Sequence, residues 1–145
     1  VVVASGVWAR RLIPGLPIEV RRAQAARARG RLSAMFHVLD TGLYARPDGR
    51  FLVAGDGDMP WRGTPDARAS RVTRTFLGEV AAELGRTLRQ CGAPAPGSAG
   101  LVAMTADRRP VVGRRGAVWV ACGFGGDGFA LAPAFAEEVA REALS

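Results

Sequence analysis

The sequence predicts a mixed α/β fold of α+β character, in which an antiparallel sheet is inserted between two pieces of another layer. Three observations predict it. The chain opens on a β-branched run at 1–4, a hairpin signal surrounds Pro47-Asp48-Gly49, and 117–144 has the pattern of strand, glycine loop and helix. The 145 residues match one domain or a piece of one, and 48% hydrophobic residues can form a packed core.

The first third of the chain contains strand signals interrupted by one short helix. Val1–Ala4 lacks alternation, which is typical of a central parallel strand buried on both faces. A short helix can begin within 7–12, before Pro14-Gly15 breaks it. The weak alternation of 18–31 indicates one or two strands of a sheet whose other face is open to water.

A hairpin and a long helix are predicted next. Residues 43–46 and 51–54 are expected to be the two strands of the hairpin. Pro47-Asp48-Gly49 between them is expected to be the turn, because Pro presets φ and Gly accepts positive φ. Thr64-Pro65 is expected to start the helix as N-cap and first residue, and the helix ends near Cys91-Gly92. Its buried face recurs every fourth residue: Val72, Phe76, Val80, Leu84 and Leu88. The Pro/Gly/Ser-rich stretch 93–100 is expected to be a connecting loop.

The end of the chain carries a glycine loop, Gly123–Gly128, between an apolar strand and a helix. This arrangement presents backbone N–H groups and a helix N-terminus to an anionic or electron-rich ligand. The terminal helix is expected to have Pro133 in its first turn and to bury one side, formed by Phe135, Val139, Ala143 and Leu144. The loop satisfies G-x-G-x-x-G, but no second strand or ribose-binding acid follows it, as a dinucleotide-binding unit requires. We therefore expect it to serve a nucleotide-type cofactor held mainly by other residues; a tight turn without a ligand is the alternative.

Composition argues against several function classes. The net charge is +7 and every basic residue is Arg, so a Walker A loop and a Schiff-base lysine are both excluded. Cys91, Cys122 and His37 are too few and too scattered for a usual zinc site, and we expect no metal. The arginine-rich stretch 21–31 contains no aromatic residue, which argues against nucleic-acid binding. No apolar run is long enough for a membrane span and no signal peptide is evident, so we expect a cytoplasmic protein.

Four motifs follow one another along the chain: VVVASGVWA at 1–9, LYARPDG at 43–49, TADRRPVVG at 105–113 and GFGGDGFALAP at 123–133. They cover most of the chain. In their order and spacing they resemble the motifs of the D-amino acid oxidase and glycine/sarcosine oxidase (DAO) family of FAD-dependent oxidoreductases.

The resemblance implies a partial FAD-binding Rossmann-like layer and a mostly antiparallel substrate-domain sheet with one long helix. Residues 1–16 would be a remnant of the FAD-binding domain, 17–100 the substrate region and 101–145 the return to the FAD-binding domain. The chain begins in mid-strand and lacks the family's N-terminal dinucleotide-binding segment, so it corresponds to the C-terminal portion. The implied activity is oxidation of an amine or amino-acid-like small molecule by hydride transfer to flavin N5, with the chain alone inactive.

The same resemblance suggests site residues. In the family the late glycine loop lies at the pyrimidine edge of the flavin, and the first motif lies near the pyrophosphate. The implied cofactor-binding residues are Ser5, Gly6, Trp8, Gly123, Phe124, Gly125, Gly126, Asp127, Gly128 and Phe129. Plain packing is an equal alternative for Trp8. Tyr44, Arg46 and Met104 are candidate substrate-binding residues, and no catalytic residue is assigned.

The chain departs from the family pattern at three places. Asp127 stands where the family often has His, and it would oppose negative charge on the flavin unless it points away or caps the helix. Ala130 replaces a Lys of some amine oxidases, and 101–103 lacks the Arg that clamps a substrate carboxylate. Two alternatives therefore stay open: a truncated or degenerate flavin-binding module without catalysis, and a basic interaction protein that binds nucleic acid.

Overall fold

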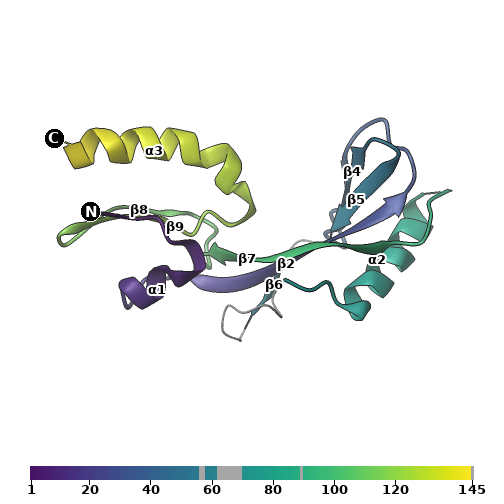
Figure 1. The fold of residues 1–145 in the computed structure, drawn as a ribbon, viewed down its shortest axis with the longest axis horizontal. Helices are drawn as coiled ribbons and strands as arrows, with labels where there is room; N and C mark the ends of the chain where they lie inside the picture. Colours follow the sequence, from purple (N-terminus) through teal and green to yellow (C-terminus); the bar gives the residue numbers. More distant parts are fainter. Residues whose placement is uncertain (56–57, 62–69, 89, 145) are drawn as a thin grey trace. The chain divides into compact units, whose positions relative to one another are not determined.

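The computed structural model describes residues 1–55, 58–61, 70–88 and 90–144. These residues form a mixed α/β fold with antiparallel sheets and a C-terminal helix, which confirms the predicted fold class (Figure 1). The chain divides into two compact units. The first unit contains Val1–Arg21, Pro60–Pro65 and Leu101–Ser145. The second unit contains Arg22–Met59 and Asp66–Gly100. The assignment of FAD-binding and substrate regions to the chain stays a prediction.

The first unit contains a three-stranded sheet in the order β1-β9-β8. β1 (Val2–Val3) pairs in parallel with β9 (Val118–Cys122), which is antiparallel to β8 (Val111–Arg115). The parallel direction of β1 was predicted, but its central, doubly buried position is wrong. Within the described part of the chain β1 pairs with β9 alone, so Val1 stays 89% exposed. An apolar run predicts a strand with neighbours on both sides, and in the described residues β1 has a neighbour on one side only.

Two short helices follow β1 and one long helix ends the unit. The 3-10 turn η1 (Gly6–Trp8) and α1 (Ala9–Leu12) confirm the predicted short helix. After β9, the 3-10 turn η2 (Gly125–Asp127) leads into α3 (Gly128–Leu144), which runs along the β8–β9 hairpin (Figure 1). Val139 is buried on the predicted side of α3, but Ala143 is exposed and Pro133 lies in the second turn, not the first.

A buried cluster in the first unit joins these elements. Leu16 and Ile18, which follow α1, pack with Ala103, Val120 and Cys122 from the late strands. Because the stretch after α1 and the glycine-loop strand share this core, residues far apart in sequence have fixed positions relative to each other.

The second unit is formed around the long strand β2 (Glu19–Arg29), which begins at the boundary of the two units. β2 pairs with β5 (Phe51–Gly55), which pairs with β4 (Tyr44–Asp48) and through it with β3 (Phe36–His37). The short strand β6 (Asp58–Pro60) and β7 (Ala95–Met104) also pair with β2. The region 18–31 is thus a single strand, which is one of the two predicted possibilities.

The predicted hairpin is present, with its turn displaced. Asp48 pairs with Phe51, so Gly49 and Arg50 form the turn, and Gly49 has φ of +64°. Pro47 lies within β4 opposite Leu52. A proline is tolerated there because the ladder between β3 and β4 stops at Ala45, so its missing N–H is not required.

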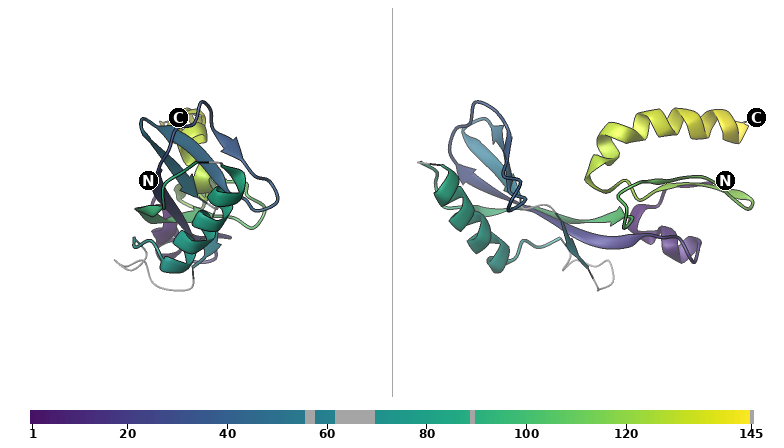
Figure 2. Two further views of the ribbon diagram at one scale, coloured as in Figure 1. Left: turned by 90° about the vertical axis from the view of Figure 1, so that its right-hand side faces the viewer. Right: turned by 180° about the vertical axis from the view of Figure 1, so that it is seen from behind.

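Helix α2 (Arg74–Thr87) covers one face of this sheet, as Figure 2 shows from behind. The predicted start at Thr64-Pro65 is wrong for this helix, and those two residues lie outside the described ranges. Thr73 is the N-cap, and its hydroxyl accepts a hydrogen bond from the Phe76 N–H at 3.2 Å. Three residues of the predicted apolar face, Phe76, Val80 and Leu84, are fully buried against β2, β4 and β5. The other two, Val72 and Leu88, lie just outside the helix and are half-buried against the same core.

The stretch 93–100, predicted as a loop, belongs mostly to strand β7. Gly97 explains how a Pro/Gly-rich segment joins the sheet: a Cβ at this position would lie 2.6 Å from the carbonyl oxygen of Ala25 on β2. Only glycine allows this approach of the two backbones, so the residue that suggested a loop is the one that permits the strand pairing.

Candidate functional site

The glycine loop links β9 to α3 and has a sharply turned backbone. Gly123 and Gly125 have φ of +79° and +57°, in the left-handed region that favours glycine. Phe124 forms a bridge with Met104 at the end of β7, and its ring contacts that of Phe135 on α3, with centroids 5.6 Å apart. The loop is therefore held from both sides by the first unit.

A pocket of about 250 Å³ lies beside this loop. Three segments line it: Ala4 and Gly6 after β1, the end of β7 at Leu101–Ala103, and Ala121–Gly125. The structure thus brings together the first and last sequence motifs. Of the predicted cofactor-binding residues, Gly6, Gly123, Phe124 and Gly125 line this pocket. The hydroxyl oxygen of the neighbouring Ser5 is buried without a hydrogen-bond partner among the described residues.

Other predicted cofactor-binding residues lie on the outside of the first unit. Trp8 is 50% exposed and Phe129 is 99% exposed. Gly126 and Asp127 are also exposed, and Gly128 is half-buried. The Asp127 carboxylate has no hydrogen bond or ion pair within the described ranges, so it does not cap the helix that follows. Asp127 and Phe129 do not line the glycine-loop pocket.

The glycines of the loop are required for different reasons. A Cβ on Gly125 would lie 2.7 Å from Cε of Met104, and one on Gly128 would lie 3.2 Å from Cβ of Phe124. Contacts within the protein therefore account for these two glycines. A Cβ on Gly126 would meet nothing within 4 Å. Gly126 is thus the loop glycine whose lack of a side chain the protein's own packing does not explain.

The candidate substrate residues fall in both units. Tyr44 and Arg46 lie on the same face of β4, opposite the face that packs on α2, because Ala45 between them is buried in that core. Met104 belongs to the first unit, where its side chain lies against Gly125. Val102, in the run without the expected arginine, lines the glycine-loop pocket.

Sequence reasoning missed Gly55, the cross-strand partner of Tyr44. A Cβ on Gly55 would lie 2.6–2.7 Å from three atoms at the hydroxyl end of the Tyr44 ring. The Tyr44 ring therefore lies directly over the Gly55 backbone. No signal in the sequence identifies this contact, because it depends on the register of β4 and β5.

The electrostatics of the first unit are local. Burial raises the pKa of the Cys122 thiol, which favours the neutral form beside the pocket. In the second unit, His37 is exposed, with Nε2 3.2 Å from the Gly42 carbonyl oxygen. In the described ranges, no three His, Cys, Asp or Glu side chains gather as metal ligands would.

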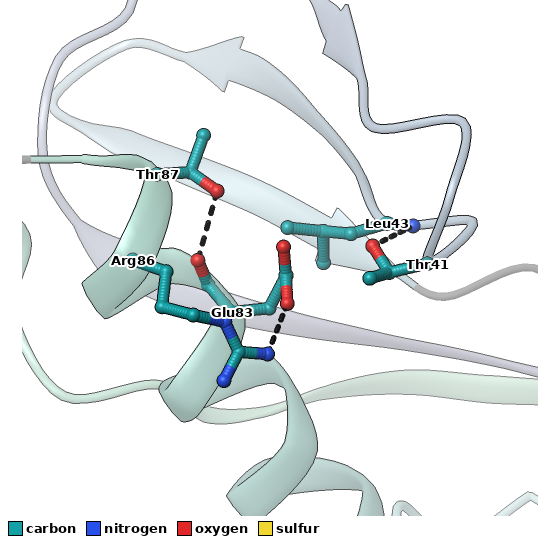
Figure 3. Close-up of polar contacts among 5 residues, drawn as sticks. All are labelled: Thr41, Leu43, Glu83, Arg86 and Thr87. Atoms are coloured by element: carbon teal, nitrogen blue, oxygen red, sulfur yellow. Dashed lines mark hydrogen bonds and ion pairs between the residues drawn. The ribbon is translucent and has the colours of Figure 1, made fainter.

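A second pocket, of about 320 Å³, lies between α2 and the loop before β4. Figure 3 shows the nearly buried Glu83 carboxylate paired with Arg86, one turn along the same helix. The Thr87 hydroxyl donates to the Glu83 carbonyl oxygen at 2.9 Å, and the Leu43 N–H donates to the Thr41 hydroxyl at 3.4 Å. These local contacts satisfy the polar groups, so we assign this pocket a structural role.

One family model matches almost the whole chain. A family model described as FAD dependent oxidoreductase (DAO) matches residues 1–142. No curated protein matches the chain. Among the described residues, no helix has the length and apolar character needed to cross a membrane.

Several solved structures share the fold. Glycine oxidase from Geobacillus kaustophilus matches with a TM-score of 0.78 and 24% identity over 96% of this chain. L-proline dehydrogenase from P. horikoshii matches with a TM-score of 0.73 and 25% identity over 92% of this chain. Iminodiacetate oxidase from Chelativorans sp. matches with a TM-score of 0.68 and 21% identity over 92% of this chain. The chain spans only 40%, 39% and 39% of these three proteins, respectively.

Proposed function

The chain belongs to the DAO family of FAD-dependent oxidoreductases, and from this premise we propose that it forms the flavin-edge and substrate-facing part of an enzyme that oxidises an amine or amino-acid-like substrate. The observation that carries the proposal is the pocket shared by Gly6 and Gly123–Gly125. It joins the first and last sequence motifs at a helix N-terminus, where a family that uses FAD requires contacts with an electron-rich ring.

The residues at this pocket fit a contact with one part of FAD. The unpartnered Ser5 hydroxyl can donate a hydrogen bond to a bound group. Gly126 leaves open space on the exposed side of the loop. The first N–H groups of a helical segment have no partners within it, so those at 125–126 are free to face a ligand. A volume of about 250 Å³ suits a ring edge and not the whole dinucleotide.

When bound, FAD supplies the acceptor, at flavin N5, for the hydride that leaves the substrate carbon. The protein's contribution at the loop is electrostatic. Backbone N–H groups at the start of the η2–α3 helical segment would stabilise negative charge on a bound flavin ring, with a further contribution from the α3 dipole. The Asp127 side chain is exposed and does not cap the helix. Its negative charge disfavours a reduced flavin least if the carboxylate stays in water, where it is screened.

We propose that Arg46 binds the substrate carboxylate and that Tyr44 contacts the same substrate. The two side chains share one face of β4, and no ion pair occupies Arg46 among the described residues. A guanidinium can bind a carboxylate through two parallel hydrogen bonds. This role would compensate for the apolar run Leu101–Ala103, which has no arginine. Met104 supports Gly125 and is a weaker candidate.

Catalysis also needs a dinucleotide-binding segment that these 145 residues do not supply. We propose that the chain alone binds FAD weakly and does not turn over amines. The alternative is a truncated or degenerate flavin module without activity, favoured by the missing arginine and by Asp127. The expected cytoplasmic location stays a prediction.

The deciding experiment uses the longest protein encoded with this chain. Purified protein should show the absorbance bands of bound flavin, and those bands should bleach under anaerobic conditions with glycine, L-proline, iminodiacetate or a simple amine. A 2-hydroxy acid serves as the control substrate. Bleaching by dithionite but by no amine or amino acid would contradict the enzyme and support the degenerate module.

A substitution at Gly126 separates a flavin contact from a structural turn. Gly126→Val adds a side chain where the protein has no atom within 4 Å, so folding should be retained. If the ring edge lies there, the FAD dissociation constant should rise about tenfold or more. Gly78→Val, at an equally open position on α2, is the matched control. Equal FAD affinity for both variants would mean that the flavin does not contact the exposed side of the loop at Gly126.

A further inference from the structure

A larger cavity in the first unit, of about 550 Å³, belongs neither to the glycine-loop pocket nor to the sheet face that carries Tyr44. Its walls come from Arg10 on α1, the stretch 16–19, the residues 105–107 and 109–112, and Arg115. Leu16 and Ile18 form an apolar floor, and they are only 4% and 2% exposed because they belong to the buried cluster. Pro110 and Val111 add apolar surface. Most small-molecule sites combine such a preformed apolar wall with a few polar groups.

The charged groups around this cavity favour an anion. Arg10, Arg109 and Arg115 line it, together with the acids Glu19 and Asp107. Both acids already have protein partners: Glu19 pairs with Arg21 at 3.5 Å, and Asp107 Oδ1 accepts the Arg109 N–H at 3.1 Å. The arginines are less occupied. Arg10 donates one long hydrogen bond, of 3.3 Å, to the Ile18 carbonyl oxygen.

Arg109 and Arg115 are the most available cations of the cavity. Neither guanidinium forms a hydrogen bond or ion pair within the part of the chain that the structure describes. The backbone N–H of Arg109 donates to Asp107 and thereby contributes most to the lowered pKa of that carboxyl. The Arg109 guanidinium also attracts the Asp107 carboxylate, but the two form no ion pair in the described ranges, so the guanidinium can still bind a ligand.

The turn that carries Arg109 has a strained backbone. Arg108 has φ of +60°, the only positive value for a non-glycine residue in the described ranges. Three hydrogen bonds hold the turn: Arg108 N–H to Thr105 O at 3.1 Å, Thr105 hydroxyl to Arg109 O at 2.7 Å, and Arg109 N–H to Asp107. Strain of this kind persists only when the surroundings impose it, and it concentrates at ligand-binding positions.

We propose that this cavity binds an organic anion with an apolar body and one carboxylate or phosphate group. The apolar part packs on Leu16, Ile18 and Pro110, and Arg109 and Arg115 bind the anionic group through charge-assisted hydrogen bonds. The cavity volume exceeds that of an inorganic ion and lies in the range of small-molecule sites. The proposal does not depend on flavin, because every lining residue comes from outside the glycine loop.

The test follows binding to the full chain by ¹⁵N NMR. Phenyl phosphate and benzoate are the two organic probes, and inorganic phosphate and benzyl alcohol lack one half of the proposed chemistry. At least one organic anion should shift the amide signals of 105–112 and bind more tightly than inorganic phosphate or benzyl alcohol. Which of the two binds more tightly distinguishes a phosphate from a carboxylate ligand.

Substitutions of the two arginines, and of a neighbouring arginine as control, test which cations bind the anion. Arg109→Gln and Arg115→Gln should each weaken binding about tenfold. Arg114→Gln is the matched control, since Arg114 precedes Arg115 on β8, does not line the cavity and donates to Gly116 O at 3.1 Å. It should change binding less than about twofold. All three arginines are exposed, so the variants should fold as the parent does.

The proposal would be overturned by any of three results: equal affinity for inorganic phosphate and the organic anions, an equal loss in Arg114→Gln, or amide shifts confined to residues outside the cavity. Failure of this test would leave the proposed oxidoreductase function intact, because the flavin spectrum reports on a different set of residues.

Discussion

At the scale of single residues, glycines identify the places where a second group approaches the backbone. Gly55 lies under the Tyr44 ring, Gly97 lies against β2 and Gly125 lies against Met104. In all three cases the approaching group belongs to this protein. Gly126 differs because its missing side chain faces open space. The distinction matters because a glycine-rich loop by itself suggests a ligand at every glycine, whereas contacts within the protein account for the missing side chain at Gly125 and not at Gly126.

Gly55→Ala should destabilise the second unit. The added methyl group would overlap the hydroxyl end of the Tyr44 ring, and the displaced ring loses its place over the strand. We expect a loss of about 1–3 kcal/mol in the free energy of unfolding, measured by urea denaturation.

The matched variant is Gly78→Ala on α2, where a new Cβ meets nothing within 4 Å. It should stabilise the helix by about 0.5–1 kcal/mol, because alanine loses less backbone entropy than glycine. Destabilisation of similar size in both variants would mean that Tyr44 does not lie over Gly55.

Asp107 should make the stability of the first unit depend on pH in acid. The hydrogen bond from the Arg109 N–H is the main cause that lowers the pKa of the Asp107 carboxyl below 3.8 in the folded protein. A lowered folded pKa stabilises the fold above the unfolded value, and this contribution is lost as pH falls through the folded pKa.

Asp107→Asn should therefore reduce Tm near neutral pH, and the difference from the parent should shrink as pH falls below 3.8. Melting curves followed by circular dichroism between about pH 2 and 7 would measure it. Asp40→Asn, at an exposed carboxylate without a hydrogen bond in the described ranges, should match the parent throughout. A difference for Asp107→Asn that stays constant to the lowest pH would contradict the assignment.

At the scale of elements, the caps and edges decide where helices and strands begin. The apolar period of α2 predicted its buried face, but the Thr-Pro signal at Thr64-Pro65 placed its start too early. The structure selects Thr73, where the Thr73 N–H also donates to the buried Gln24 side chain at 2.8 Å. This tertiary contact from β2 anchors the helix start to the sheet.

Thr73→Ala should destabilise α2 by about 1 kcal/mol, since it leaves the Phe76 N–H without its capping acceptor. Thr75→Ala, two residues later and exposed in the same first turn, is the control. It should leave stability unchanged or slightly higher because alanine has the higher helix propensity. Comparison of the two Tm values measures the cap, and equal values would indicate that the hydroxyl does not cap the helix.

At the scale of the whole molecule, two units with separate cores carry a strongly basic charge. The arginines are spread over both units, and some are already engaged: Arg27 pairs with Asp48 at 2.8 Å and lies over the Phe51 ring at 4.6 Å from its centroid. The arginine-rich stretch 21–31 contains no aromatic residue of its own, which argues against a stacking surface for nucleic acid.

We therefore expect the protein to bind duplex DNA only weakly and without sequence preference, with a dissociation constant above about 10⁻⁵ M at physiological salt. Fluorescence anisotropy with two unrelated labelled duplexes, at increasing salt, would measure it. Tight binding that persists at high salt, or a clear preference for one duplex, would favour the nucleic-acid alternative over the oxidoreductase.

The sequence by itself determined the fold class, the buried face of α2, the hairpin and the family, because apolar periodicity, turn residues and motif order are local properties. Tertiary structure alone decided that 93–100 joins a sheet, that β1 lies at an edge, and that Gly6 and Gly123–Gly125 share one pocket. It also decided that Arg109 and Arg115 line one cavity. These features depend on strand register and on backbone approach between segments far apart in sequence, and no local pattern encodes either.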